Sequence, residues 1–283
     1  MADISAEQVR ELREKSGAGI MDCKRALAAT SGNLSEAVEF LRKEGTVKAS
    51  KKSGRMTLEG LVGLGVGKDR LSASLVELNC ETDFVARTDQ FQEFLSSVAE
   101  LIVKDKPKDL DQLQEIKLGN LPLKEAFAQL IAKLGENMTL RRFRLVQASV
   151  GEIMGTYLHA GSKIGVVIKL SGSQDEALAR DIGMHVAAMS PAYIERSQVP
   201  ASVIEREKEI AKASPDLAGK PANILGKILE GKVGRYFSEA CLLEQPFVKD
   251  TTGKKTVGAY LKEKAPNARV AEMVRFQVGE EIA

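Results

Sequence analysis

The sequence of 283 residues predicts an α+β fold with antiparallel sheets, and three observations support this class. Apolar residues recur at helical spacing through about the first fifty residues. After Met56 the pattern changes to the alternation that is typical of strands. A hairpin pattern followed by an amphipathic helix then occurs twice, which predicts two related α+β halves.

Residues 1–55 are predicted to form three short helices. Ser5 and Gln8 have the spacing of a capping box at the start of the first helix. Gly45 is predicted to end the third helix, since glycine commonly follows a helix C-terminus. A module of this size has a thin core, so we expect it to pack on a neighbour or a partner.

The segment 43–55 is predicted to be a basic linker or a frayed helix. Its basic side chains alternate with small residues, and no aromatic residue among them could stack on a nucleic-acid base. We therefore favour a solvated connector over a nucleic-acid patch. The four basic residues that define this linker are Lys48, Lys51, Lys52 and Arg55.

The first hairpin is predicted over residues 61–78, with its turn at 67–69. An amphipathic helix follows over 91–102, because its apolar residues fall on one face. A further helix is predicted to begin at Pro122 and to stop at Gly135. The next ten or so residues, MTLRRFRLVQA, are predicted to form a strand.

The second unit repeats this plan after residue 155. Strands are predicted on both sides of a turn at 161–163, and a helix over 178–189 follows them. A helical hairpin is predicted at 197–238, with its turn at 214–221, before a closing strand at 274–278.

We accordingly divide the chain into residues 1–55, 56–140 and 141–283, the last part containing the hairpin 197–238.

Composition excludes several classes of protein. Forty-one basic residues against 39 acidic ones give a formal charge of +2, which argues against a dedicated polyphosphate binder. The three cysteines lie far apart and only two histidines are present, which argues against disulfides and against zinc. Neither a secretory signal nor an apolar run long enough to span a membrane is evident, so we expect a soluble intracellular protein.

No catalytic or nucleotide-binding motif stands out. The glycine-rich run before Asp69 lacks the phosphate-loop pattern, because Val62 occupies the first glycine position and Asp69 replaces the final hydroxyl residue. Cys80 is expected to be a buried structural thiol, and His185 a core or interface histidine. His159 ends a strand at a turn, where partner contact is more plausible. We expect neither enzymatic activity nor a cofactor, although a hydrolase or transferase built on Cys80 stays open.

One segment, Thr82, Asp83, Phe84 and Val85, joins the first hairpin to the following helix. In one interpretation Phe84 packs inward near Phe91 and Asp83 caps the helix. In the other interpretation Phe84 points outward and inserts into a partner as an aromatic wedge. The residues alone leave both interpretations open.

Six separated motifs resemble the elongation factor Ts family, the nucleotide-exchange factors of the translational GTPase elongation factor Tu. They follow the order of the family along nearly the whole chain. The motifs are REKSGAGIMDCKRAL, NCETDFVARTDQF, GSKIGV, MHVAAMSP, LLEQPFVKD and RFQVGEEI.

The resemblance implies a fold and a partner. The fold is a ubiquitin-associated-like three-helix module, two α+β core subdomains and an inserted coiled-coil hairpin. The partner is the GDP-bound form of cytoplasmic elongation factor Tu, from which the factor displaces magnesium without itself binding nucleotide. Whether the hairpin makes a homodimer or a 2:2 complex stays open. A translation-associated RNA-binding protein that uses the basic linker is the alternative function.

The resemblance also implies roles for individual residues. Those of the segment described above, Thr82, Asp83, Phe84 and Val85, would displace the magnesium ion, with Phe84 wedged between helices of the GTPase. The remaining partner contacts implied by the resemblance are Arg13, Ile20, Met21 and His159, and Ile20 stands where methionine is frequent in the family.

Overall fold

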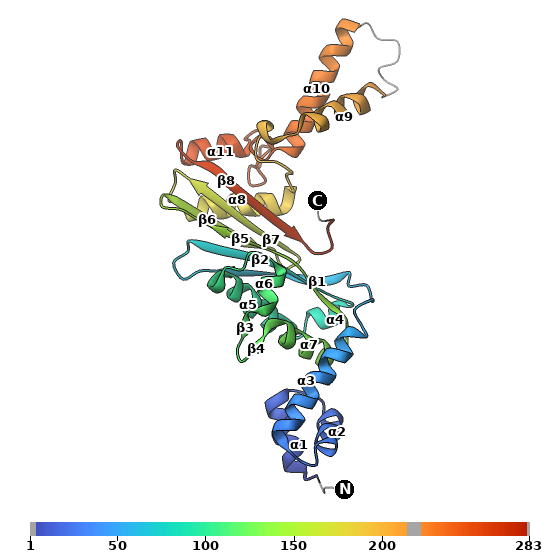
Figure 1. Cartoon of the computed structure of the whole chain (residues 1–283). Helices are drawn as coiled ribbons and strands as arrows, with labels where there is room; N and C mark the ends of the chain where they lie inside the picture. The colour runs from blue at the N-terminus through green and yellow to red at the C-terminus, as the bar shows by residue number, and fades with distance from the viewer. Residues whose placement is uncertain (1–3, 214–221, 282–283) are drawn as a thin grey trace.

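A computed structural model describes residues 4–213 and 222–281 and shows an elongated molecule (Figure 1). A helical module lies at the N-terminal end. Two antiparallel sheets with their helices form the middle, and a helical hairpin projects from the opposite end. The α+β class predicted from the sequence is confirmed.

Three helices form the N-terminal module: α1 (Ala6–Ser16), α2 (Ile20–Ala29) and α3 (Leu34–Ser50). The capping box of Ser5 and Gln8 is present, with each side chain bonded to the backbone N–H of the other residue. The core of the module is small, as expected, and consists of Leu12, Cys23, Ala26, Leu27 and Ala37. Its likeness to a ubiquitin-associated module stays a prediction.

The prediction that Gly45 ends the third helix is wrong, because α3 continues to Ser50. Gly45 lies where α3 packs against α7 (Leu123–Leu134): a Cβ there would lie 3.8 Å from the carbonyl oxygen of Ala128, an ordinary van der Waals distance. The ion pair between Arg42 and Glu125 joins the same two helices. Packing against α7 therefore carries α3 past this glycine.

The first sheet has the order β1-β2-β5, with β1 (Glu59–Val66), β2 (Ser72–Cys80) and β5 (Met138–Gln147) all antiparallel. The predicted hairpin and strand are thus confirmed. One face of the sheet packs against α5 (Asp89–Asp105) and α7, and the apolar stripe of α5 lies in this core.

Three short elements between α5 and α7 were not predicted from the sequence. They are α6 (Leu110–Glu115) and the two-stranded hairpin of β3 (Lys117–Leu118) with β4 (Leu121–Pro122). Their strands have two residues each, too few for a periodic pattern to be recognised in the sequence.

The second sheet repeats the first in its order β6-β7-β8, with β6 (Glu152–Leu158), β7 (Ile164–Ser171) and β8 (Arg269–Gln277). In both sheets the pairing of the middle strand with the last strand shifts register once, at Glu77/Leu78 and at Lys169/Leu170. α8 (Glu176–Met189) covers the second sheet as α5 covers the first. The predicted pair of related halves is confirmed.

The two sheets pack face to face. Their shared core takes residues from both sheets: Val62, Ala73, Leu75, Val146, Val167 and Phe276. Glycine permits the close approach, since a Cβ on Gly165 would lie 2.8 Å from the side chain of Val62. Helices on the two outer faces complete a four-layered arrangement (Figure 1).

A buried ionic network ties the C-terminal segment to the first sheet. Glu77 is fully buried, and its carboxylate accepts hydrogen bonds from Arg141, Arg142 and the Gly279 N–H at 2.7–2.9 Å. These bonds outweigh the opposing effect of burial and lower the pKa of Glu77. Arg142 also pairs with Glu280 at 2.7 Å. The network therefore fastens the chain beyond β8 to the other half of the core.

β5 crosses the domain boundary that we predict between residues 140 and 141. Its residues pair with β2 along the whole strand, so the segment up to Gln147 belongs to the first sheet. We therefore propose that the boundary between the two core subdomains lies after Gln147. The other predicted divisions stay predictions.

The projecting hairpin consists of α9 (Ala201–Lys212) and α10 (Ala222–Ala240). Val199, Val233, Phe237 and Cys241 form its core at the base. The turn predicted at 214–221 lies outside the described residues, and dimerisation through the hairpin stays a prediction.

In the described residues of the C-terminal part, three further short helices occur that the sequence did not predict. They are η1 (Arg196–Gln198), η3 (Leu242–Glu244) and α11 (Val257–Lys264). His185 of α8 is fully buried here, with its Nε2 2.9 Å from the amide oxygen of Gln245, while its Nδ1 accepts from the Val248 N–H. The expectation of a satisfied core histidine is thus confirmed. None of the helices within 4–213 and 222–281 has both the length and the apolar character to cross a membrane.

Candidate functional site

The segment Thr82–Val85 begins a helix of one turn, α4 (Asp83–Ala86), directly after β2. The hydroxyl of Thr82 accepts a hydrogen bond from the Val85 N–H and so caps this turn. Val85 and Ala86 are buried in the core beneath α5. Since a single turn cannot bury all its side chains in one direction, anchoring Val85 and Ala86 leaves Phe84 on the outer side.

Phe84 is 79% exposed. The interpretation that packs it inward near Phe91 is therefore wrong: Phe91 is fully buried, and Phe94 of the same helix stacks on Phe127 instead. A large apolar ring that faces solvent beside a carboxylate is the feature that the wedge interpretation requires. Whether the ring enters a partner stays a prediction.

Asp83 lies beside Phe84 and forms an ion pair with Arg87, at 2.7 Å, across one helical turn. Thr82 is held from another part of the chain, because both its N–H and its hydroxyl donate to the Glu136 carboxylate, at 2.9 and 2.6 Å. The sequence interpretation overlooked Glu136. The available signal was its place directly after Gly135, the C-cap of α7, where a loop must meet the end of the neighbouring strand.

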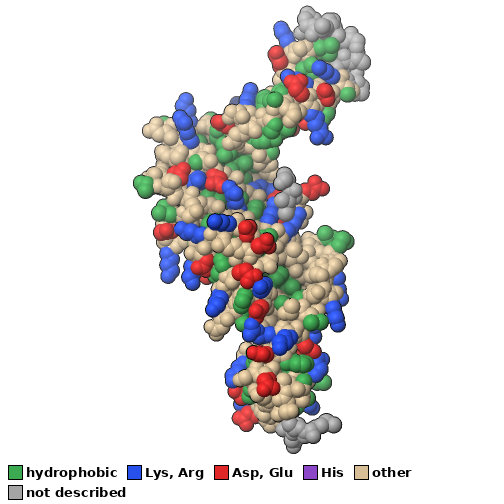
Figure 2. All heavy atoms as spheres, viewed as in Figure 1, with side chains coloured by type: hydrophobic (Ala, Val, Ile, Leu, Met, Phe, Trp, Pro, Cys, Tyr) green, Lys and Arg blue, Asp and Glu red, His purple; other side chains and the backbone are tan. Residues whose placement is uncertain are grey.

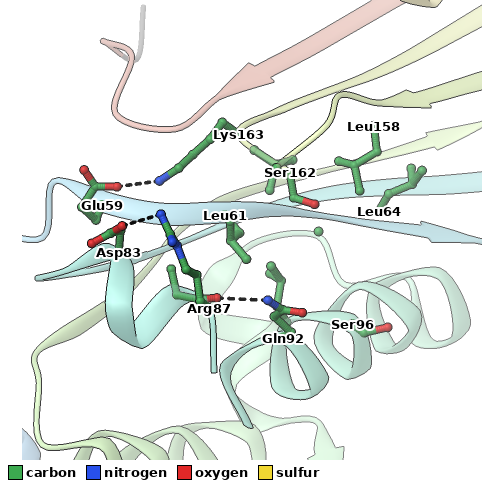
Figure 3. A pocket seen from close by; sticks show the side chains of 15 residues that line it. Glu59, Leu61, Leu64, Asp83, Arg87, Gln92, Ser96, Leu158, Ser162 and Lys163 are labelled. Atoms are coloured by element: carbon green, nitrogen blue, oxygen red, sulfur yellow. Dashed lines mark hydrogen bonds and ion pairs between the residues drawn. The ribbon is translucent and has the colours of Figure 1, made fainter. Parts of the chain in front are cut away.

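A groove of ≈ 640 Å³ opens next to Asp83 and Arg87 (Figure 3). Its apolar lining includes Leu61 and Leu64 of β1 and Leu158 at the end of β6. An ion pair of 2.6 Å between Glu59 and Lys163 crosses its rim and joins the two core subdomains. The groove therefore continues from α4 to the β6–β7 turn.

His159 belongs to that same β6–β7 turn. It is exposed, and its Nδ1 lies 3.1 Å from the hydroxyl of Tyr157. The turn is fixed to the first sheet, because the N–H of Val62 donates to the carbonyl oxygen of Ser162 at 2.7 Å. His159 itself does not line the groove, but its neighbour Leu158 and the turn residues Gly161–Lys163 do.

Arg13, Ile20 and Met21 come together elsewhere, at the junction of α1 and α2. Gly17 ends α1 in the left-handed conformation, with φ of 66°, and this turn sets the two helices beside each other. All three side chains are exposed, Ile20 by 56% and Met21 by 75%, and they line one shallow depression. The module therefore offers a small apolar contact surface bordered by a cation.

The alternative of a catalytic Cys80 is wrong. The thiol is fully buried and donates to the carbonyl oxygen of Thr82. Burial, reinforced by the nearby Glu136 carboxylate, raises the pKa of Cys80 to about 12, so the nucleophilic thiolate is not formed near neutral pH. Within the described residues, no three histidine, cysteine or acidic side chains are grouped so that they could hold a metal.

The basic linker is mostly engaged within the chain. Lys48 pairs with Asp22, Arg55 pairs with Glu81, and Lys52 donates to the carbonyl oxygen of Gly135. The first half of the linker is helical, as part of α3. Over the face seen in Figure 2, basic and acidic side chains are interspersed along the molecule. These pairings weaken the RNA-binding alternative, which depends on free cations in this segment.

Comparison with known proteins identifies one family. The family model described as Elongation factor TS matches residues 81–280. Elongation factor Ts of Alkalilimnicola ehrlichii is 46% identical over 277 residues, which cover 98% of this chain and 92% of that protein. The proteins of the same name from Thioalkalivibrio sulfidiphilus and Limosilactobacillus fermentum are 43% and 44% identical, over 99% and 100% of this chain and 93% and 94% of their own.

Proposed function

The chain belongs to the elongation factor Ts family and acts in translation elongation, and on this premise we propose that it is the guanine-nucleotide exchange factor of elongation factor Tu. In this proposal it binds the GDP-bound GTPase and displaces the magnesium ion. GDP then leaves and GTP can bind. The chain makes and breaks no bond, so it is not an enzyme.

The observation that carries the proposal is the exposure of Phe84, 79%, on a turn whose other apolar side chains are buried. An exposed ring with an anchored base can enter a partner without first leaving its own core. Asp83 brings a carboxylate to the same place, where it repels phosphate oxygens and attracts the ion that neutralises them. The wedge and the charge act on one target, the magnesium site.

Exchange follows from linkage. Magnesium bridges phosphate oxygens to the GTPase, so its removal weakens GDP binding. Each tenfold loss of nucleotide affinity requires about 1.4 kcal/mol, which the factor must supply from its own binding energy. Nucleotide weakens the factor by the same ratio, so GTP binding releases it.

Binding energy of that size needs contacts beyond Phe84. We propose that the exposed surface of Arg13, Ile20 and Met21 contacts the GTPase domain and that His159 contacts a more distant domain of the partner. The groove between α4 and the β6–β7 turn offers further apolar surface beside Asp83, lined by Leu61, Leu64 and Leu158. Several separate contacts of this kind let the factor hold the partner while one of them distorts it.

The test is release of fluorescent GDP from elongation factor Tu after rapid mixing with the chain. We expect strong acceleration in the presence of magnesium. When a chelator has already removed magnesium, the factor should add much less, because that step is complete. Unchanged GDP release in magnesium would refute exchange activity, whereas equal acceleration with and without magnesium would refute magnesium displacement.

A further inference from the structure

We propose that Glu136 is a positioning residue for exchange: it locks the loop that carries Phe84, so that contact with the partner distorts the partner and not the loop. The inference rests on the proposed function and deepens it. No role in exchange follows from the sequence motifs for this residue, which lies 54 positions after Thr82.

Two loops are joined here by a reciprocal set of hydrogen bonds. Glu136 accepts from the N–H and the hydroxyl of Thr82, at 2.9 and 2.6 Å. In return, Glu81, the residue before Thr82, accepts from the N–H of Asn137 at 2.6 Å. Adjacent residues of each loop thus hold adjacent residues of the other.

This lock, the set of bonds between Glu81–Thr82 and Glu136–Asn137, also includes the segment before β1. The amide group of Asn137 donates to the carbonyl oxygen of Arg55 at 2.7 Å, and Arg55 pairs with Glu81. Asn137 is buried, so its bonds are shielded from competition by water. The β2–α4 loop is therefore fixed to the start of β5 and to the segment before β1.

Phe84 depends on this lock through a short path. The hydroxyl that Glu136 accepts from is the same one that caps α4 by accepting from Val85. A helix of one turn cannot hold its direction by its own hydrogen bonds, because the cost of nucleation is not recovered over so few residues. Burial of Val85 and Ala86 selects the outward side for Phe84, and the Thr82 cap, held by Glu136, keeps the turn from moving there.

Such a lock has a specific kinetic consequence. The affinity of the complex comes from several separated contacts, so a loosened wedge changes docking little. In the complex, a flexible loop changes its own conformation, so less of the binding energy is used to distort the magnesium site of the partner. Loss of the lock should therefore lower the maximal rate of GDP release more than it changes the concentration of factor at half-maximal rate.

The test compares Glu136→Ala with Glu115→Ala as a matched control. Glu115 lies in the same subdomain, and its carboxylate pairs with Lys124 in the first turn of α7, whereas Glu136 follows the other end of that helix. We expect Glu136→Ala to lower the maximal rate of GDP release about tenfold, equivalent to about 1.4 kcal/mol, with less than about a twofold change in half-saturation. Glu115→Ala should match the unaltered chain in both quantities.

Amide hydrogen exchange supplies a readout that does not depend on activity. In Glu136→Ala, exchange should accelerate about tenfold at residues 82–88 and stay unchanged in the core of α5. Global acceleration together with a lower melting temperature would mean that Glu136 only stabilises the fold, and it would overturn the inference.

The two proposals fail in different ways. If the unaltered chain does not accelerate GDP release, the proposed function is wrong and the role of Glu136 falls with it. If the unaltered chain does so and Glu136→Ala has the same maximal rate, the exchange function stands and the positioning role is wrong.

Discussion

Replacement of Phe84 by alanine should separate exchange from folding. About a fifth of the residue is hidden in the free chain, since 79% of it is exposed. For an aromatic side chain of roughly 200 Å², that corresponds to ~40 Å² and to at most about 1 kcal/mol of folding free energy. The variant should therefore remain folded with nearly unchanged stability.

The effect on exchange should be larger. Insertion into the partner would hide up to ~160 Å² more, which is worth as much as about 4 kcal/mol. If half of this energy acts on the step that releases GDP, the loss is about 2 kcal/mol, or roughly thirtyfold in rate. Stopped-flow release of fluorescent GDP measures this rate, and urea unfolding measures the stability.

Two control variants show what to expect of an exposed and of a buried apolar residue. Val150→Ala truncates a fully exposed apolar residue outside the proposed contacts and should change neither quantity. Phe91→Ala removes a fully buried ring and should cost about 3–5 kcal/mol of stability. A folded Phe84→Ala protein that releases GDP at the unaltered rate would refute the wedge.

Three further predictions concern the fold. Glu77→Gln should cost about 1–3 kcal/mol in urea unfolding, because it leaves the partly buried Arg141 and Arg142 without their buried carboxylate; an unchanged midpoint would contradict the network. The pKa of Glu77 is lowered in the folded protein, so its contribution to stability is present above the unfolded-state pKa of about 4.3. That contribution is lost on acidification through the lower folded value. Glu77→Gln should therefore make the free energy of unfolding depend less on pH in this range. Burial lowers the pKa of His185, so stability should decline as pH falls below about 6.5, and His185→Gln should remove that slope in thermal unfolding. Gly155→Ala should cost about 1–3 kcal/mol, because its Cβ would lie 2.3 Å from the backbone of Ala179 in α8, and equal stability would contradict this packing.

Helices and strands with a clear period were predictable from the sequence. The six apolar positions of α5 and the alternating β1–β2 hairpin report local geometry directly, since each residue's direction follows from 3.6- or 2-residue repeats. The prediction at Gly45 was wrong for a nonlocal reason: α3 continues to Ser50 while packed against α7, and contacts with a helix far along the chain cannot be read from the local pattern.

The candidate site divides in the same way. The motif Thr82–Val85 and the family were evident from residues in order along the chain. The outward direction of Phe84 was not, because both directions satisfy the same local pattern and only the burial of Val85 and Ala86 selects one. Glu136 was missed because its partner is Thr82, on a separate loop.

The sequence by itself therefore determined the class of fold, the repeat of its two halves and the family. Tertiary structure decided which loops meet, which ring is left exposed, and how the two sheets share a core. The physical reason is the distance along the chain over which each kind of interaction acts. Propensity and periodicity act over a few residues, whereas the contacts that aim Phe84 and join the sheets form only when distant segments pack together.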